Sequence, residues 1–250
     1  MKERFLGELK YISPARLIKK GENDKLADFF LVLGSIFNDL KGFILFEKLV
    51  TENYQKPEPK EITAHAGEYG GVLIQIHKMI ASTIHEFFRF LNENEDILKS
   101  KDFKELLTRL STHYRERWDE IIAVAFNKIP EASAFTETLV KIRNNVGFHY
   151  YQSGKNLRKG FINKFFNKEK SSDNKNESAY YTIGENMGST RFFYCDASVE
   201  EFLFITTGND SLSPKTKYMG QVRAIIDDMN FAIASILKEY IRMRRNSPQK

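Results

Sequence analysis

The stretch from Asn23 to Val50 carries apolar residues at the three- and four-residue spacing of an α-helix, and a helix this long restricts the chain to few architectures. Asn23 or Asp24 can act as the N-cap, and Pro57 and Pro59 prevent the helix from continuing. The sequence has 14 glycines and 6 prolines among 250 residues, which is few for a sandwich or barrel of short strands. We therefore expect an all-α fold.

The same spacing predicts further helices along the chain. Their approximate ranges are 13 to 20, 63 to 92, 100 to 129, 131 to 152 and 214 to 244. Four to five long helices joined by short turns are typical of an up-and-down helical bundle. We expect this bundle to form a single domain over residues 1–250.

Residues 153–178 differ in composition from the predicted helices, since they hold seven Lys or Arg against three Asp or Glu. In residues 179–196, two aromatic and β-prone runs flank GENMG, which predicts a β-hairpin. A short helix is expected next, with Ser198 as its cap and Glu201 three residues further on. The sequence therefore predicts a basic loop and a small β-hairpin, inserted at about 153–196 before the last helix.

The net charge and the cysteine count indicate in which cellular compartment the protein works and which kinds of partner it can bind. The formal net charge of +5 is compatible with a polyanionic partner. A single cysteine, Cys195, excludes an intramolecular disulfide and favours a reducing compartment. The N-terminus lacks the apolar core of a signal peptide, and no run of 18 apolar residues is found. We expect a cytoplasmic protein that makes no membrane contact.

The stretch KIRNNVGFHY, residues 141–150, brings Arg143, Asn144 and His149 together near a helix end. Metal-free RNA cleavage needs a base for the 2′-hydroxyl, an acid for the leaving 5′-oxygen and a cation for the phosphorane. Histidine transfers protons near neutral pH, arginine binds phosphate through its planar fork, and an amide can orient either group. One histidine cannot be base and acid at once, so a second histidine, from another protomer or from elsewhere in the chain, would help.

This arrangement resembles the motif of HEPN-domain ribonucleases, in which Arg is followed by Asn, His or Asp, a short spacer and His. Arg143, Asn144 and His149 match its three positions, within an all-α bundle. The resemblance implies a metal-independent endoribonuclease that cleaves single-stranded RNA without a cofactor. It also implies a homodimer whose two motifs share one cleft, and a role in toxin–antitoxin growth arrest or antiviral defence, with a small antitoxin or regulatory protein as partner.

Two other readings of this stretch stay open. Arg143 and Asn144 can be solvated helix residues, with His149 as a partly buried cap. The bundle can also be a non-catalytic dimeric module that binds RNA, a nucleotide or a protein partner.

A carboxylate on the first long helix can support the motif. Asp39 interrupts an apolar stretch and could face the Arg-His helix, where it would orient Arg143. Alternatively, Asn38 and Asp39 lie on a polar helix face beside Lys41.

The remaining histidines were considered as metal ligands. His77 and His85 are eight residues apart, Glu86 is adjacent, and His113 lies near Glu116. Neither a Glu-x-x-His pair nor HExxH occurs, so we interpret these residues as interfacial or surface histidines and expect no metal.

The basic segment mixes cations with aromatic rings, a combination that binds single-stranded RNA. Its RNA-binding candidates are Lys155, Arg158, Lys159 and Lys164, interleaved with Phe161, Phe165 and Phe166. The alternative, which we favour, is an amphipathic turn whose Phe residues pack on the bundle while its lysines are solvated. Both can hold together.

Overall fold

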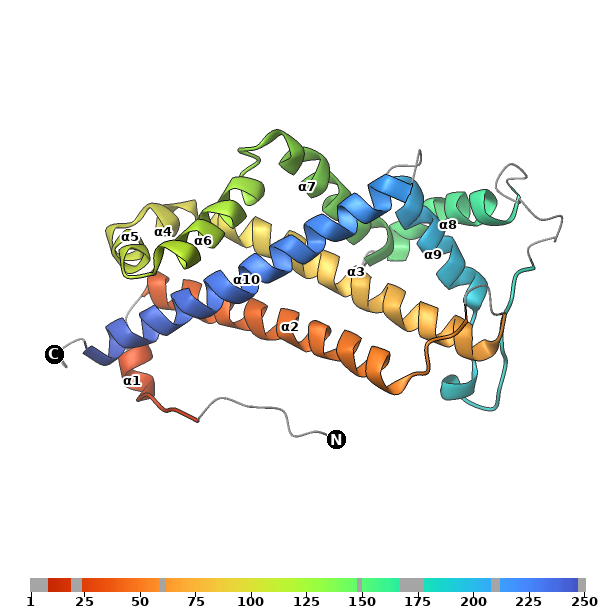
Figure 1. The fold of residues 1–250 in the computed structure, drawn as a ribbon, viewed down its shortest axis with the longest axis horizontal. Helices are drawn as coiled ribbons and strands as arrows, with labels where there is room; N and C mark the ends of the chain where they lie inside the picture. Colours follow the sequence, from red (N-terminus) through yellow and green to blue (C-terminus); the bar gives the residue numbers. More distant parts are fainter. Residues whose placement is uncertain are drawn as a thin grey trace.

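The computed structural model describes residues 9–18, 24–58, 62–147, 150–166, 178–207 and 212–246. Every regular element in these ranges is helical, which confirms the all-α expectation (Figure 1). The α-helices are α1 (Pro14–Leu17), α2 (Lys25–Asn53), α3 (Ala64–Glu93), α4 (Glu95–Lys99), α5 (Lys101–Thr108), α6 (Thr112–Ala125), α7 (Pro130–Ile142), α8 (Tyr150–Phe165), α9 (Phe193–Thr206) and α10 (Leu212–Asn246). A π-helix, η1 (Arg143–Gly147), joins α7 towards α8, and η3 (Met187–Ser189) is a 3₁₀ turn.

The longest helices begin where the sequence offers a cap. Asp24 accepts a hydrogen bond from the Ala27 amide at the start of α2, which decides between the two expected caps. Thr63 accepts from the Ala66 amide at the start of α3. Each such bond satisfies a backbone N–H that has no partner within the helix, and losing it costs about 1 kcal/mol.

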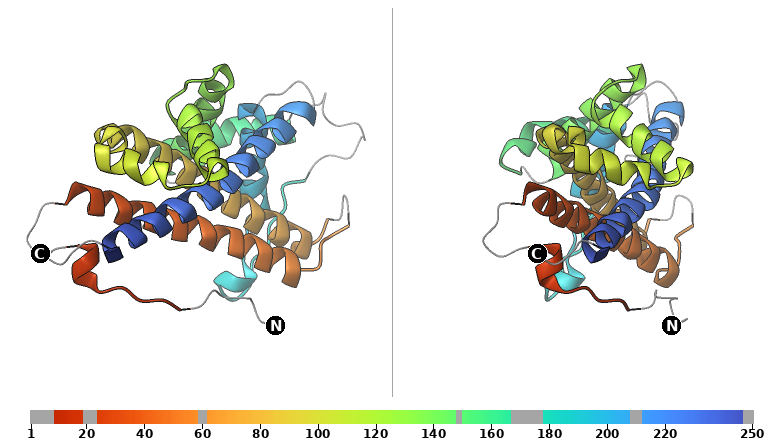
Figure 2. Two further views of the ribbon diagram at one scale, coloured as in Figure 1. Left: turned by 60° about the vertical axis from the view of Figure 1, so that its left-hand side comes forward. Right: turned by 90° about the vertical axis from the view of Figure 1, so that its left-hand side faces the viewer.

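Helices α2, α3 and α10 form the centre of the bundle (Figures 1 and 2). α2 packs against both α3 and α10, while α6 covers α10 and α7 covers α3. Among the most buried side chains are Phe29, Leu33, Leu40, Ile84, Phe87, Leu91, Trp118, Ile121, Leu139, Met229, Ile233 and Ile236. Each fully buried side chain of this kind stabilises the fold by roughly 1.5–3 kcal/mol, so the interlocked apolar stripes hold the bundle together.

Helix α2 also leaves apolar residues on the surface, among them Leu31, Val32, Ile44 and Phe46. By length and composition alone it could cross a membrane, with a mean hydropathy of 1.7 in a window that is 22% buried. A core helix passes the same test, and α2 contributes Leu33 and Leu40 to the core. The cytoplasmic location therefore stays a prediction.

The helix predicted over residues 100–129 is wrong as one element, because it divides into α5 and α6. Ser100 caps α5 through the Phe103 amide, as its position indicates. The backbone at Ser111 is extended and turns the chain, which places Leu110 in the core. α6 ends before Asn127, whose φ of 50° lies in the left-handed region that Asn tolerates.

The helix predicted over residues 131–152 is also interrupted. α7 ends at Ile142, η1 follows, and α8 begins at Tyr150. α8 continues to Phe165, so the part of the expected basic loop from 153 to 165 is helical. Residues 167–177, which belong to the expected basic loop, lie outside the described residues.

The predicted β-hairpin is not seen in the described residues 178–207. One isolated antiparallel bridge joins Thr182 to Arg191, and the aromatic run that was expected to be a strand starts α9 at Phe193. Ser198 lies inside α9, where its hydroxyl donates to the Tyr194 carbonyl at 2.6 Å, so it does not cap the helix. The short helix is therefore longer than expected and begins five residues earlier.

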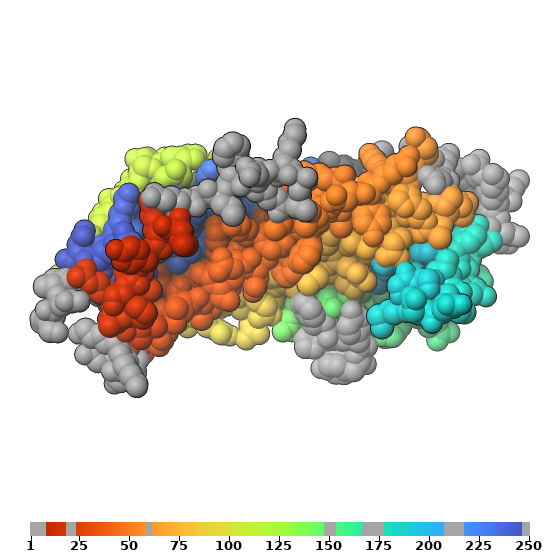
Figure 3. Space-filling view, turned by 90° about the horizontal axis from the view of Figure 1, so that it is seen from below, coloured from red at the N-terminus to blue at the C-terminus, as the bar shows by residue number. Residues whose placement is uncertain are grey.

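Two glycines of α3 allow the segment 178–193 to pack closely against the start of that helix. A β-carbon on Gly67 would lie 2.5 Å from the Phe193 ring, and one on Gly71 would lie 2.1 Å from the Arg191 guanidinium. Arg191 also forms 2.8 Å ion pairs with Glu68 of α3 and Asp196 of α9. The segment 178–193 thus rests on the bare backbone at the start of α3 (Figure 3, cyan against orange).

Helices α8 and α9 cross at another glycine, Gly160. A β-carbon on Gly160 would lie 2.1 Å from the Ser198 carbonyl oxygen, so only glycine permits this approach. The pair is also joined by a hydrogen bond from Asn163 to Glu201. This crossing fixes α8, and α8 is the element that follows η1 in the chain.

We predict that Gly160→Ala destabilises the protein by about 1–3 kcal/mol, because the added methyl group meets backbone that must move. Gly154→Ala in the same helix is the matched control, since a β-carbon there has nothing within 4 Å. The control should gain roughly 0.5–1 kcal/mol of helix propensity. Denaturant unfolding of both variants tests this, and equal stabilities would contradict the crossing.

Candidate functional site

The π-helix η1 places the Arg-Asn part of the motif against α3. Val146 and Gly147 are buried, whereas Arg143, Asn144 and Asn145 are half-buried. A β-carbon on Gly147 would lie 2.8 Å from the hydroxyl of Ser82, a buried residue of α3. Short π segments within helices are frequently found at functional sites, because the wider turn re-aims side chains.

Arg143 is held by a carboxylate of α3. Its Nε lies 2.9 Å from Glu86 Oε1, and its Nη1 donates to Asn144 Oδ1 at 3.0 Å. The Arg143 side chain keeps 24% of its surface exposed. The guanidinium is therefore oriented by two groups and still reaches solvent.

The supporting role predicted for Asp39 is taken by another residue. Asp39 is an exposed residue of α2, whereas the carboxylate that contacts Arg143 belongs to Glu86 of α3. Asn38 is also exposed, as expected if both residues lie on a polar face of α2. Glu86 was considered in the sequence only as a neighbour of a metal-ligand candidate.

His85 joins the same group of side chains. Its Nδ1 lies 3.4 Å from Glu86 Oε1, the oxygen that also contacts Arg143. This distance exceeds that of a well-formed hydrogen bond, and within the described residues the buried Nδ1 has no hydrogen-bond partner. We define the Arg143 cluster as His85, Glu86, Arg143 and Asn144.

The surroundings of His85 favour its neutral form. Its side chain is only 13% exposed, and burial lowers the pKa of His85 below its usual 6.5. Glu86 acts in the opposite direction, and the charges of Arg143 and Arg89 lower this pKa further. Of the two positions expected for His85, interfacial or surface, the half-buried side chain fits the interfacial one. Burial favours the uncharged imidazole beside the guanidinium.

The third member of the motif, His149, lies outside the described residues. On a regular helix, Arg143 and His149 would point about 120° apart. That geometry does not apply, because Arg143–Gly147 is a π-helix. The side chain of Asn145 hydrogen-bonds to Asn156 of α8, which ties η1 to the helix that follows His149.

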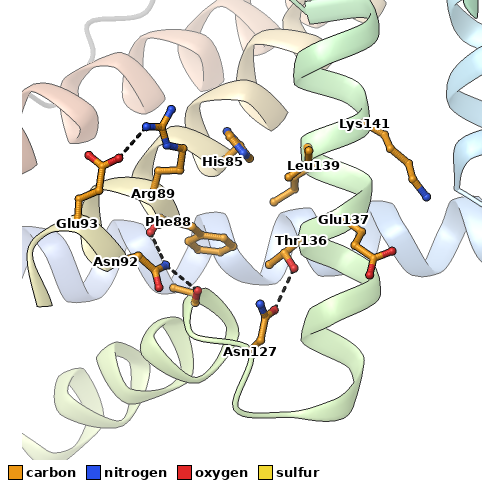
Figure 4. Close-up of a pocket in the computed structure, with 12 residues that line it drawn as sticks. His85, Phe88, Arg89, Asn92, Glu93, Asn127, Thr136, Glu137, Leu139 and Lys141 are labelled. Atoms are coloured by element: carbon orange, nitrogen blue, oxygen red, sulfur yellow. Dashed lines mark hydrogen bonds and ion pairs between the residues drawn. The ribbon is translucent and has the colours of Figure 1, made fainter.

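A cleft of about 520 Å³ opens beside the cluster, between α3 and α7 (Figure 4). Its polar lining comes from His85, Arg89, Asn92, Glu93, Asn127, Thr136, Glu137 and Lys141. Thr136 donates to Asn127 Oδ1 at 2.9 Å, and Asn92 donates to the Ala125 carbonyl at 2.9 Å, which fixes the walls. The volume falls in the range of small-molecule sites, and the lining offers both donors and acceptors.

The basic residues of α8 divide into two groups. Lys155, Arg158 and Lys159 are exposed, while Lys164 is half-buried and engaged in a contact. Phe161 is half-buried and meets Tyr194 of α9 edge-to-face at 6.3 Å. The favoured reading, packed rings with solvated cations, fits Phe161 and the first three cations, but Phe166 is 70% exposed.

The other histidines do not join the Arg143 cluster. His77 pairs with Glu47 of α2 at 3.5 Å, and His113 lies against the rings of Tyr114 and Phe231. In the described ranges, no group of three or more His, Cys, Asp or Glu residues is placed to hold a metal ion. Cys195 is an exposed residue of α9, and the partial desolvation of its thiol raises the pKa of that group.

Comparison of the chain with protein-family models, with curated proteins and with solved structures found no match. The chemistry of the site therefore rests on its residues alone. A guanidinium, an imidazole, a carboxylate and an amide meet in the Arg143 cluster, and His85 is the member of the cluster that also lines the cleft. This set of groups suits binding of a phosphate and transfer of a proton.

We predict that Glu86→Gln lowers the pKa of His85 further, because the carboxylate that favours the protonated imidazole is removed. Glu93→Gln is the control, since Glu93 pairs with Arg89 at 2.7 Å and makes no contact with His85 in the described contacts. NMR titration of the His85 ring protons measures both variants. An unchanged pKa in Glu86→Gln would show that the two side chains do not interact.

Proposed function

We propose that the protein is a metal-independent endoribonuclease of the HEPN type, which cleaves single-stranded RNA through Arg143, Asn144 and His149. The observation that carries the proposal is the Arg143 cluster, in which an oriented guanidinium and a neutral imidazole share one carboxylate oxygen. The spacing of the motif supplies the rest of the support. Arg143 binds the phosphate, Asn144 orients Arg143, and His149 transfers a proton.

A substrate phosphate competes with Glu86 for Arg143. Guanidinium binds phosphate as well as carboxylate, in both cases through parallel hydrogen bonds. Asn144 keeps the guanidinium plane in place through its 3.0 Å contact during this exchange. The arrangement supplies the cation that phosphoryl chemistry needs without a metal ion.

The biological setting is part of the same proposal. We expect a cytoplasmic homodimer in which two copies of η1 border one RNA-binding cleft. Growth arrest in a toxin–antitoxin pair or in phage defence fits such an enzyme, with a small antitoxin or regulatory protein restraining it.

A second candidate function is a non-catalytic dimeric module that binds RNA, a nucleotide or a protein. The 2.9 Å ion pair between Arg143 and Glu86 favours this alternative, because an arginine engaged in this way can serve a structural purpose. Cleavage assays separate the two candidates.

We expect the purified protein to cleave a single-stranded RNA in the presence of EDTA, and His149→Ala and Arg143→Ala to lower the rate by 10²-fold or more. Arg109→Ala is the matched control, because Arg109 forms an exposed helical pair with Glu105 at 2.6 Å. Circular dichroism confirms folding. Cleavage by His149→Ala at the wild-type rate would favour the binding module.

We also expect the exposed cations of α8 to bind the RNA backbone. Replacing Lys155, Arg158 and Lys159 together with Ala should weaken RNA binding and reduce the slope of log K against log salt by about 2. Lys99, Lys101 and Lys104 lie at the opposite end of the bundle and form the control triple (Figure 1). Equal effects of the two triples would mean that α8 has no special role.

A further inference from the structure

We propose that His85 of α3 is the proton acceptor of the RNA-cleaving site and acts beside Arg143. This inference rests on the proposed ribonuclease function and assigns to the same site a residue outside the motif. His85 would then be a second histidine for the reaction, next to the His149 of the motif.

The first argument is position. Glu86 Oε1 lies 3.4 Å from His85 Nδ1 and 2.9 Å from Arg143 Nε, so the imidazole and the guanidinium both lie beside this one oxygen. A phosphate bound by Arg143 would therefore lie near the His85 ring. Nucleophile activation requires this kind of proximity between a base and the phosphate-binding cation.

The second argument is access. His85 is enclosed by α3 and α7, yet it lines the cleft of about 520 Å³ and keeps 13% of its side chain exposed (Figure 4). Nδ1 faces Glu86, which leaves the other ring nitrogen for a ligand in the cleft. Asn92, Asn127 and Thr136 supply further hydrogen-bonding groups at the walls, as recognition of a ribose or a base requires.

The third argument is charge. The charged groups that act on His85 are Glu86 and Arg89 on its own helix and Arg143 on η1. Glu93 of α3 and Glu137 and Lys141 of α7 line the same cleft. Burial and the two arginines keep the imidazole unprotonated at neutral pH, as a base must be. Glu86 stabilises the imidazolium that forms when the ring accepts a proton, and the 3.4 Å gap allows their contact to shorten at that moment.

The resulting reaction balances with two histidines. His85 takes the proton of the 2′-hydroxyl, and the 2′-oxygen forms a bond to phosphorus. The bond from phosphorus to the 5′-oxygen breaks, and His149 gives its proton to that oxygen. The products are a 2′,3′-cyclic phosphate and a free 5′-hydroxyl. His85 then releases the proton it accepted to the solvent, and His149 takes up a proton from the solvent.

The test compares His85→Gln with His77→Gln by cleavage rate across pH 5 to 9 and by affinity for a 2′-O-methyl RNA, which cannot be cleaved. His77 is the matched control, since it lies on the same helix and pairs with Glu47. We expect His85→Gln to lower the rate by 10²- to 10⁴-fold, to leave the affinity within a few-fold, and to abolish the acidic limb of the pH profile. His77→Gln should match the wild type in all three measurements.

Two outcomes overturn the proposal in different ways. If His85→Gln cleaves as the wild type does while His149→Ala is inactive, His85 is not the base and the ribonuclease stands. If the wild type itself does not cleave RNA, the proposed function fails and the role of His85 fails with it.

If His85→Gln does not fold, the pH dependence of the wild type and of Glu86→Gln provides a second test. The wild-type rate should rise with pH through a midpoint below 6.5, and Glu86→Gln should move that midpoint to lower pH. A midpoint that does not move in Glu86→Gln would overturn the assignment without any substitution of His85.

Discussion

Gly147 and Ser82 approach so closely that a β-carbon on the glycine would lie 2.8 Å from the serine hydroxyl, and the site depends on this contact. With larger side chains at either position, η1 would be pushed away from α3, and Arg143 would be separated from Glu86. The contact has an energetic cost, because the buried Ser82 hydroxyl has no hydrogen-bond partner in the described residues. Such a group typically costs about 1–3 kcal/mol, which the burial of Val146 and Ile142 in the core offsets.

The carboxylate of Glu86 then sets the electrostatics of the cluster. It lies 2.9 Å from Arg143, 3.9 Å from Arg89 and 3.4 Å from His85, so one anion serves three basic side chains. With 47% of its side chain exposed, Glu86 remains in contact with solvent. His85 is more enclosed, and this burial lowers the pKa of its imidazole.

The sequence predicted the elements whose signals are local. The apolar spacing of α2 and α3, together with the cap expected for α2, located both helices to within a few residues. α10 was predicted from its apolar stripe, whose residues from Val222 to Ile236 are mostly buried. The breaks at Ser111 and at η1 could not be predicted in this way, because the backbone departs from helix there to satisfy packing against other elements. The hairpin was mispredicted for a similar reason. The β-prone ring of Phe193 packs on the bare backbone at Gly67, which outweighs strand propensity.

In the site too, some residues could be predicted from local sequence signals and others only from packing between elements. Arg143, Asn144 and His149 could be selected from spacing and chemistry, whereas Glu86 and His85 enter the site only because α3 packs against η1. The available signal was the polar pair His85–Glu86 between the apolar residues Ile84 and Phe87. A polar pair of this kind marks a helix face that meets another element, but it does not reveal which one.

The glycine face of α3 has a consequence for the order in which the chain folds. Glu68 and Arg191 form an ion pair across a separation of 123 residues, and Phe193 covers Gly67. During synthesis, the first turns of α3 therefore emerge long before the residues that cover them, with glycines that disfavour a helix on its own. The start of α3 completes late on the ribosome, whereas its end, which packs locally against α4, can form early.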